Sequence, residues 1–176
     1  MRRILLLLVG VASLMVSTTV AARSEGHAAE PAYLVVRNAS ADGGVAGKPI
    51  VTVVVRGFVL GRVAQEGAVE AYHLASSTGS IAAQATGVDV SRRAVSWRGV
   101  PGTEFSGSGF RFRAVGGVWR VVVYGSGVSL YAGGEASRIT LHGSATYPTQ
   151  DGEYSLDGGP FVSLPSGVVS PIIEAK

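Results

Sequence analysis

Apolar and polar residues alternate through the stretch FRFRAVGGVWRVVVYG, which runs from Phe110 to Gly125. A period of two is the pattern of a β-strand that buries one of its faces. Gly116-Gly117 interrupts the alternation at its centre, and a Gly-Gly pair between two such runs predicts a hairpin turn. The core side of this hairpin would pair Ala114 with Trp119, Phe112 with Val121 and Phe110 with Val123.

The opposite face of the predicted hairpin carries arginines. It pairs Arg113 with Arg120 and Arg111 with Val122, and Tyr124 continues the same face. Like charges directly opposite each other on neighbouring strands are mildly destabilising. Glutamates on the adjoining strands, screening by solvent or an anionic ligand would offset this repulsion. The candidate glutamates are Glu70, Glu104 and Glu135. The candidate ligand-binding residues are Arg111, Arg113, Arg120 and Tyr124.

From Tyr33 onward the chain consists of short valine-rich runs broken by Gly, Asp, Asn and Pro, which is the composition of strands and turns. Gly57 and Gly61 are expected to bend or bulge the long second run. The pattern predicts strands at Tyr33–Asn38, Ile50–Val63, Ala68–Ala75, Ile81–Val90, Ala94–Arg98, Gly109–Val115, Val118–Gly125, Val128–Ala132, Ser137–Tyr147, Tyr154–Leu156 and Phe161–Leu164. The fold class is therefore all-β, an antiparallel β-sandwich or small barrel of roughly 9–11 short strands.

A short β-solenoid is the alternative architecture. The segments Gly87–Gly99 and Gly127–Gly143 share an outline of Gly-Val, strand, gap, strand and Gly. Stacked repeats would produce such an outline, but at least three copies are generally needed for a stable stack. Two unequal copies favour the sandwich or barrel.

The first residues have the pattern of a Sec-type signal peptide. Met1-Arg2-Arg3 is basic, Ile4 to Val16 is almost wholly apolar, and small residues follow up to Ala22. The apolar run is shorter than the roughly 20 residues that a membrane-spanning helix needs. The predicted organisation is a signal peptide (1–22), a flexible leader (23–32), a single all-β domain (33–165) and a C-terminal tail (166–176). The mature chain is expected to be secreted or associated with the cell envelope, with no membrane span.

Removal of the signal peptide changes the charge balance. The chain has 15 Lys and Arg against 12 Asp and Glu, and loss of Arg2 and Arg3 leaves 13 against 12. A nucleic-acid partner is therefore not expected, because it would require a concentrated basic surface. The mature chain has no cysteine, so the core must stabilise the fold without disulfides. The chain is glycine-rich, with 25 Gly, and its preference for Arg over Lys is typical of a GC-rich bacterial genome.

Catalytic and metal-binding patterns are weak in this sequence. No Ser lies in a Gly-x-Ser-x-Gly motif, and neither His73 nor His142 has a recognisable partner for acid–base chemistry. The acidic residues Asp151, Glu153 and Asp157 could serve a hard cation, but Asp151-Gly152 and Asp157-Gly158 are typical turn dipeptides. We therefore assign no catalytic residue, no metal site and no cofactor.

Exposed aromatic side chains would indicate carbohydrate binding. Trp97 and Trp119 alternate in phase with valines and are expected in the core, whereas Tyr124, Tyr131 and Tyr147 are candidates for a sugar-stacking platform. The sequence favours a non-catalytic binding or structural domain, with an anionic envelope polymer, a polysaccharide or a protein as its partner. The alternative is a hydrolase or carbohydrate-binding module that acts on wall or extracellular polysaccharide.

Overall fold

The computed structural model describes residues 32–40, 49–75, 79–85, 90–142, 152–164 and 168–169. Nine strands and no helix occupy these ranges: β1 (Ala32–Ala39), β2 (Val51–His73), β3 (Ser80–Ala85), β4 (Ser91–Trp97), β5 (Val100–Gly125), β6 (Val128–His142), β7 (Glu153–Leu156), β8 (Val162–Ser163) and β9 (Val168–Val169). The all-β prediction is confirmed. The predicted signal peptide, the leader up to residue 31 and most of the tail lie outside the described residues. Within the described ranges, no helix has the length and apolarity needed to cross a membrane.

The strands form one antiparallel sheet that does not close on itself. Its order is β3-β5-β2-β6-β1-β7-β8, with β4 paired to β5 and β9 paired to β6. Every ladder between described strands is antiparallel. A stack of solenoid repeats would place parallel strands side by side. Moreover, β4 and β6 come from the two segments with a shared outline, and they pair with different strands. The solenoid alternative is therefore not supported.

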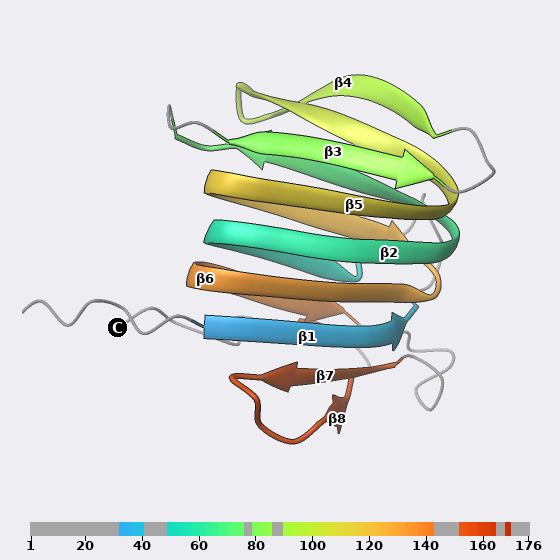
Figure 1. Cartoon of the computed structure of the whole chain (residues 1–176), viewed down its shortest axis with the longest axis vertical. Helices are drawn as coiled ribbons and strands as arrows, with labels where there is room; N and C mark the ends of the chain where they lie inside the picture. Colours follow the sequence, from blue (N-terminus) through green and yellow to red (C-terminus); the bar gives the residue numbers. More distant parts are fainter. Residues whose placement is uncertain are drawn as a thin grey trace, which may run out of the picture.

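Three long strands fold the sheet into two layers, because each of them passes from one layer to the other (Figure 1). The first layer contains β1, residues 128–133 of β6, 58–63 of β2, 110–115 of β5, and β3. The second contains residues 135–141 of β6, 51–56 of β2, 118–123 of β5, 68–73 of β2, 102–106 of β5, and β4. Figure 1 shows the first layer nearer the viewer, with the second as fainter ribbons behind it.

Glycines form one of the corners where the strands change layer. Gly57 of β2 pairs with Gly134 of β6, and on its other side it lies at a register shift opposite Gly116-Gly117 of β5. Gly134 has φ +127°, and a Cβ there would collide with the carbonyl oxygen of Arg56. A residue with a side chain would thus be strained at this corner. The predicted bulge at Gly57 is confirmed, whereas Gly61 lies in regular register and instead leaves room for the ring of Phe112.

The predicted hairpin at Gly116-Gly117 is wrong. Residues 100–125 are one strand, and its parts before and after the glycines pair with different parts of β2 rather than with each other. Arg113 pairs with Leu60, and Arg120 pairs with Val54 and Tyr72. The glycines therefore turn the chain from one layer into the other, which sequence alternation alone does not distinguish from a hairpin.

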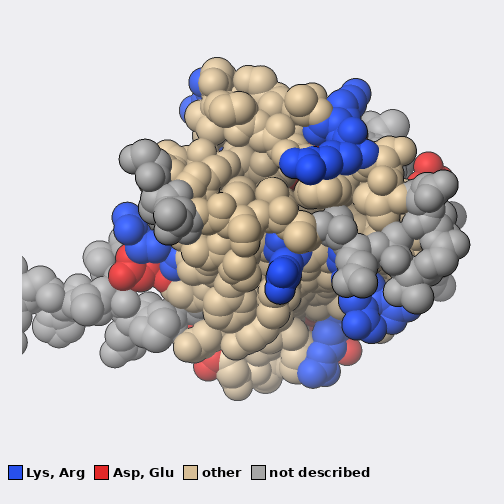
Figure 2. Space-filling view, turned by 45° about the horizontal axis from the view of Figure 1, so that its top comes forward, with Lys and Arg blue, Asp and Glu red and all other residues tan. Residues whose placement is uncertain are grey.

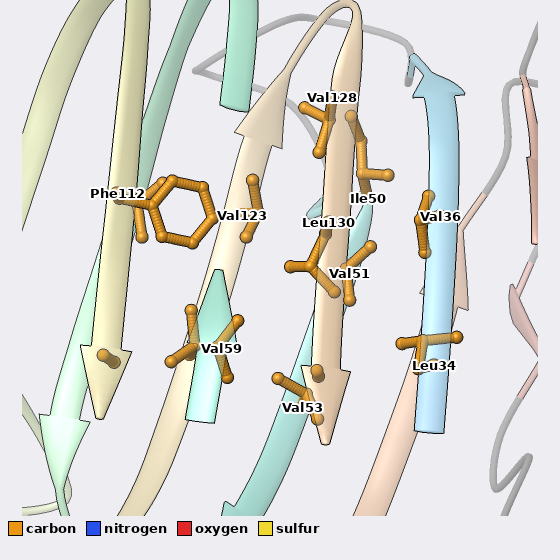
Figure 3. Close-up of a cluster of buried hydrophobic side chains, with 14 of the residues drawn as sticks. Leu34, Val36, Ile50, Val51, Val53, Val59, Phe112, Val123, Val128 and Leu130 are labelled. Carbon is orange, nitrogen blue, oxygen red and sulfur yellow. The ribbon is translucent and has the colours of Figure 1, made fainter. Parts of the chain in front are cut away.

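The apolar face of the same stretch is confirmed as core. Its six predicted inward side chains, Phe110, Phe112, Ala114, Trp119, Val121 and Val123, all belong to the buried cluster. Figure 3 shows side chains of both layers pointing toward one another, with Val59 and Leu130 from the first and Val53 and Val123 from the second. Full burial of a valine or leucine side chain stabilises a fold by about 1.5–3 kcal/mol. Valine-rich alternation therefore supplies the core that a chain without cysteine requires.

Candidate functional site

The structure divides the four candidate residues between two surfaces. Arg111 and Arg113 are exposed on the outer face of the first layer. Arg120 and Tyr124 lie on the outer face of the second layer and are partly buried. The four side chains therefore do not form a single patch, and each pair has different neighbours.

On the first layer, a third arginine joins Arg111 and Arg113. Arg62 of β2 lies directly opposite Arg111 of β5, and Leu60 lies directly opposite Arg113. Directly opposed residues share a face and have Cβ atoms about 4.5–5.5 Å apart. We call the exposed group of Arg62, Arg111 and Arg113 the arginine face.

Among the described residues, the arginine face has no neutralising partners. None of its three guanidinium groups forms an ion pair or a hydrogen bond with a described residue. The outward positions described on the first-layer parts of β6, β2, β5 and β3 include no Asp or Glu; they are Ser129, Tyr131, Phe58, Leu60, Arg62, Arg111, Arg113, Val115, Ser80 and Ala82. Figure 2 views this layer from the side of β3 and β4, and shows Lys and Arg side chains on the face and Asp and Glu at its margins.

Exposed aromatic side chains adjoin the arginine face. Tyr131 of β6 lies opposite Leu60, and each of the two residues is 40% exposed. The rings of Tyr131 and Tyr33 stack at 6.1 Å with an interplanar angle of 16°, and Phe58 meets Tyr131 edge-on at 5.2 Å. An apolar and aromatic surface therefore continues from the arginines across β2 and β6 to β1.

The second layer holds a different arrangement, which we call the Arg120 cluster: Glu70, Tyr72, Trp97, Arg120 and Tyr124. The Arg120 guanidinium carbon lies 4.5 Å from the centre of the Trp97 ring and 5.4 Å from that of Tyr72. Its Nη1 atom is buried and has no hydrogen-bond partner among the described residues. The Tyr72 hydroxyl donates a 2.7 Å hydrogen bond to the Glu70 carboxylate. Trp97 was predicted in the core. It instead lies on this outer face, where its ring, on the edge strand β4, contacts the Arg120 guanidinium.

Burial governs the ionisation of the Arg120 cluster. It raises the pKa of Tyr72 well above its usual range, and the hydrogen bond to Glu70 adds to the effect. Burial also raises the pKa of Tyr124, with the charge of Glu70 as the next cause. Burial lowers the pKa of the Arg120 guanidinium, while Tyr72 and Glu70 act in the opposite sense. Burial therefore favours the neutral phenols of Tyr72 and Tyr124 and opposes the charge of Arg120, which the nearby Glu70 carboxylate offsets in part.

The three candidate glutamates do not pair with the predicted arginines. Glu104 accepts a 2.7 Å hydrogen bond from Arg93 Nη2, and Glu135 lies 3.4 Å from Arg56 Nε. Glu70 interacts with Arg120 only as a nearby charge. The expected neutralisation is therefore partial on the second layer and has no counterpart at the arginine face among the described residues.

The residues considered for catalysis and metal binding are dispersed. His73 packs against the Trp119 ring at 4.7 Å, and its buried Nε2 has no hydrogen-bond partner among the described residues. Asp157-Gly158 forms the predicted turn, with positive φ at both residues. The Asp157 Oδ1 atom, however, accepts a 2.7 Å hydrogen bond from Tyr33 N of β1 rather than from the backbone of the turn. Asp151 and the side chain of His142 lie outside the described part. In that part, no three His, Asp or Glu side chains are grouped as metal ligands.

Sequence reasoning missed Arg62, Leu60 and Tyr33. The run FVLGRV alternates Leu60 and Arg62 against Val59 and Val63, which was a sufficient signal for their outward direction. Their position beside Arg111 and Arg113 depends on the register between β2 and β5, which alternation does not specify. Comparison of the chain with protein-family models, curated proteins and solved structures finds no match.

Proposed function

We propose that this protein is an exported, non-catalytic binding domain whose arginine face holds an anionic polymer of the cell envelope. The observation that carries the proposal is the direct opposition of Arg62 and Arg111, with Arg113 two residues away and no acidic side chain on the described outward positions around them. Repulsion of this kind costs stability, and a bound anion would relieve it. Arginine also suits such a ligand, because its fork of donors matches carboxylate, sulfate and phosphate groups.

Support for export comes from the residue pattern of the first 22 positions. An envelope polymer is a partner that an exported domain meets, and a polymer can contact several arginines of one face at once. A multivalent contact of this kind gives useful affinity even where each exposed charge contributes little.

The test compares the purified protein with the variant Arg62→Gln/Arg111→Gln/Arg113→Gln for binding to immobilised dextran sulfate and to neutral dextran. We expect binding to dextran sulfate alone, and its loss in the variant. The matched control, Arg56→Gln/Arg93→Gln/Arg98→Gln, removes the same charge from other surfaces and should retain binding. Equal loss in both triple variants would mean that net charge rather than this face is responsible, and retention in both would exclude the arginine face.

A further inference from the structure

The aromatic side chains beside the arginine face form an ordered platform. Tyr33 and Tyr131 expose 39% and 40% of their surface, and their rings are nearly parallel. Phe58 supports Tyr131 from the edge. Rings held in this way lose little freedom on binding, so they are suited to contact with a flat apolar ligand face.

A glycine leaves room for two of the rings of this platform. Gly133 lies in β6 beneath the rings of Phe58 and Tyr33, and a Cβ at this position would come within 2.6 Å of Phe58 Cζ and 2.9 Å of Tyr33 Cδ1. The backbone of Tyr33 is fixed as well, because its N–H donates to Asp157 Oδ1 and its carbonyl oxygen accepts a 2.8 Å hydrogen bond from Asp157 N. The backbone, and not only side-chain packing, therefore sets the ring positions.

The platform and the arginines form one continuous surface. Tyr131, Leu60 and Arg113 lie opposite one another on β6, β2 and β5, and Val35 continues this row on β1. Tyr33 lies two residues before Val35, in the neighbouring row. Three strand spacings of about 4.8 Å separate β1 from β5, so the row from Val35 to Arg113 is about 15 Å long. Arg62 and Arg111 lie on the same face in the row on the other side of this one, away from Tyr33. One ligand molecule could thus contact tyrosines at one end and arginines at the other.

We propose that this surface binds an acidic polysaccharide, which runs across the strands from β1 to β5. Sugar rings present apolar C–H faces that stack on tyrosine, while uronate or sulfate groups of the same chain match arginine. A polyphosphate has the charge and no ring to stack. Single-stranded nucleic acid also combines rings with anionic groups, but an exported domain meets envelope polysaccharides, so nucleic acid is the competing outcome of the test. The inference rests on the proposed function and specifies its ligand.

The test measures binding of the whole protein to three probes of equal chain charge: polygalacturonate, polyphosphate and oligothymidylate. The wild type should prefer polygalacturonate. The variant Tyr33→Ala/Tyr131→Ala should lose about tenfold in affinity for polygalacturonate and keep its affinity for polyphosphate within about twofold. The variant Tyr131→Phe keeps the ring, so it should bind polygalacturonate like the wild type and shows that folding is intact.

Two kinds of result overturn the inference. If polyphosphate or oligothymidylate binds at least as tightly as polygalacturonate, or if removal of both tyrosines leaves polygalacturonate binding unchanged, the ligand is not selected by its sugar rings. The proposed function survives either result provided that Arg62→Gln/Arg111→Gln/Arg113→Gln still abolishes binding. If none of the three probes binds the wild type but dextran sulfate does, this inference fails and the proposed function stands; if dextran sulfate does not bind either, both proposals fail.

Discussion

Replacement of Arg62 by glutamine should stabilise the protein. Arg62 lies directly opposite Arg111, both side chains are exposed, and neither has an ion-pair partner among the described residues. A binding face that holds like charges together without its ligand carries a cost in free energy. Glutamine keeps much of the length of the side chain and removes the charge, so the substitution isolates that cost.

The magnitude follows from the spacing. Two unit charges about 6 Å apart in a water-like medium repel by roughly 0.7 kcal/mol. Cross-strand pairs generally contribute about 0.2–1 kcal/mol. We therefore expect the free energy of unfolding to rise by about 0.5 kcal/mol, which for a chain of this size corresponds to a Tm increase of about 1–2 °C.

The assay is urea unfolding at low and at high salt, with m-values compared to ensure that only stability changes. The gain should appear near 10 mM salt and vanish at 1 M, where the screening length falls to about 3 Å. The matched control is Arg56→Gln, which breaks the exposed ion pair with Glu135 and should lower stability by about 0–1 kcal/mol.

The reasoning is refuted if Arg62→Gln destabilises the protein at low salt to the same extent as Arg56→Gln. A gain that is independent of salt would also count against it, because packing and not charge would then be the cause.

The remaining predictions concern the second layer, a corner and the pH range. Arg120→Ala should lower the free energy of unfolding by about 1–3 kcal/mol, because it removes the guanidinium that packs on two aromatic rings. The control Arg113→Ala should change the free energy of unfolding by less than about 0.5 kcal/mol. Equal urea midpoints for the two variants would contradict the structural role of Arg120. Gly134→Ala should lower the free energy of unfolding by about 2–4 kcal/mol, because of its positive φ and the collision of the new Cβ with the Arg56 carbonyl oxygen. Gly158→Ala, which has open space around it, should lower it by about 1 kcal/mol. Similar losses in the two variants would contradict the role given to Gly134 at the layer corner. Tyr72 and Tyr124 have raised pKa values in the folded state, so the unfolded chain loses these protons at lower pH than the folded chain. The free energy of unfolding should therefore fall as the pH rises above about 10. Thermal melts of Tyr72→Phe should show a smaller fall, and a pH profile identical to that of the wild type would contradict the assignment.

Local features of the fold were predictable from the sequence because a strand that buries one face has an apolar residue at every second position. The inward direction of Phe110, Phe112 and Trp119, and the bulge at Gly57, followed from alternation and from glycine alone. The strand over residues 100–108 was missed because Pro101, Gly102 and the serines read as a loop. Its pairing with β2 and β4 overrides that low propensity.

The candidate site was less predictable because it depends on which strands become neighbours. The alternation placed Arg111, Arg113 and Arg120 on one face of a hairpin, but a layer change at Gly116-Gly117 preserves alternation and moves Arg120 to the opposite surface. Similarly, Trp97 alternates with Val95 as a core residue would, yet β4 is an edge strand and both face outward. Long-range register is a property of the whole sheet, so a local period cannot specify it.

The most direct test of the proposed function is a map of amide chemical-shift changes in the labelled protein as dextran sulfate is added. We expect changes that centre on Arg62, Arg111, Arg113 and Tyr131, on the outer face of the first layer, and none at Arg120 or Tyr124. Changes centred on Arg120 and Tyr124, or spread evenly over both layers, would contradict it.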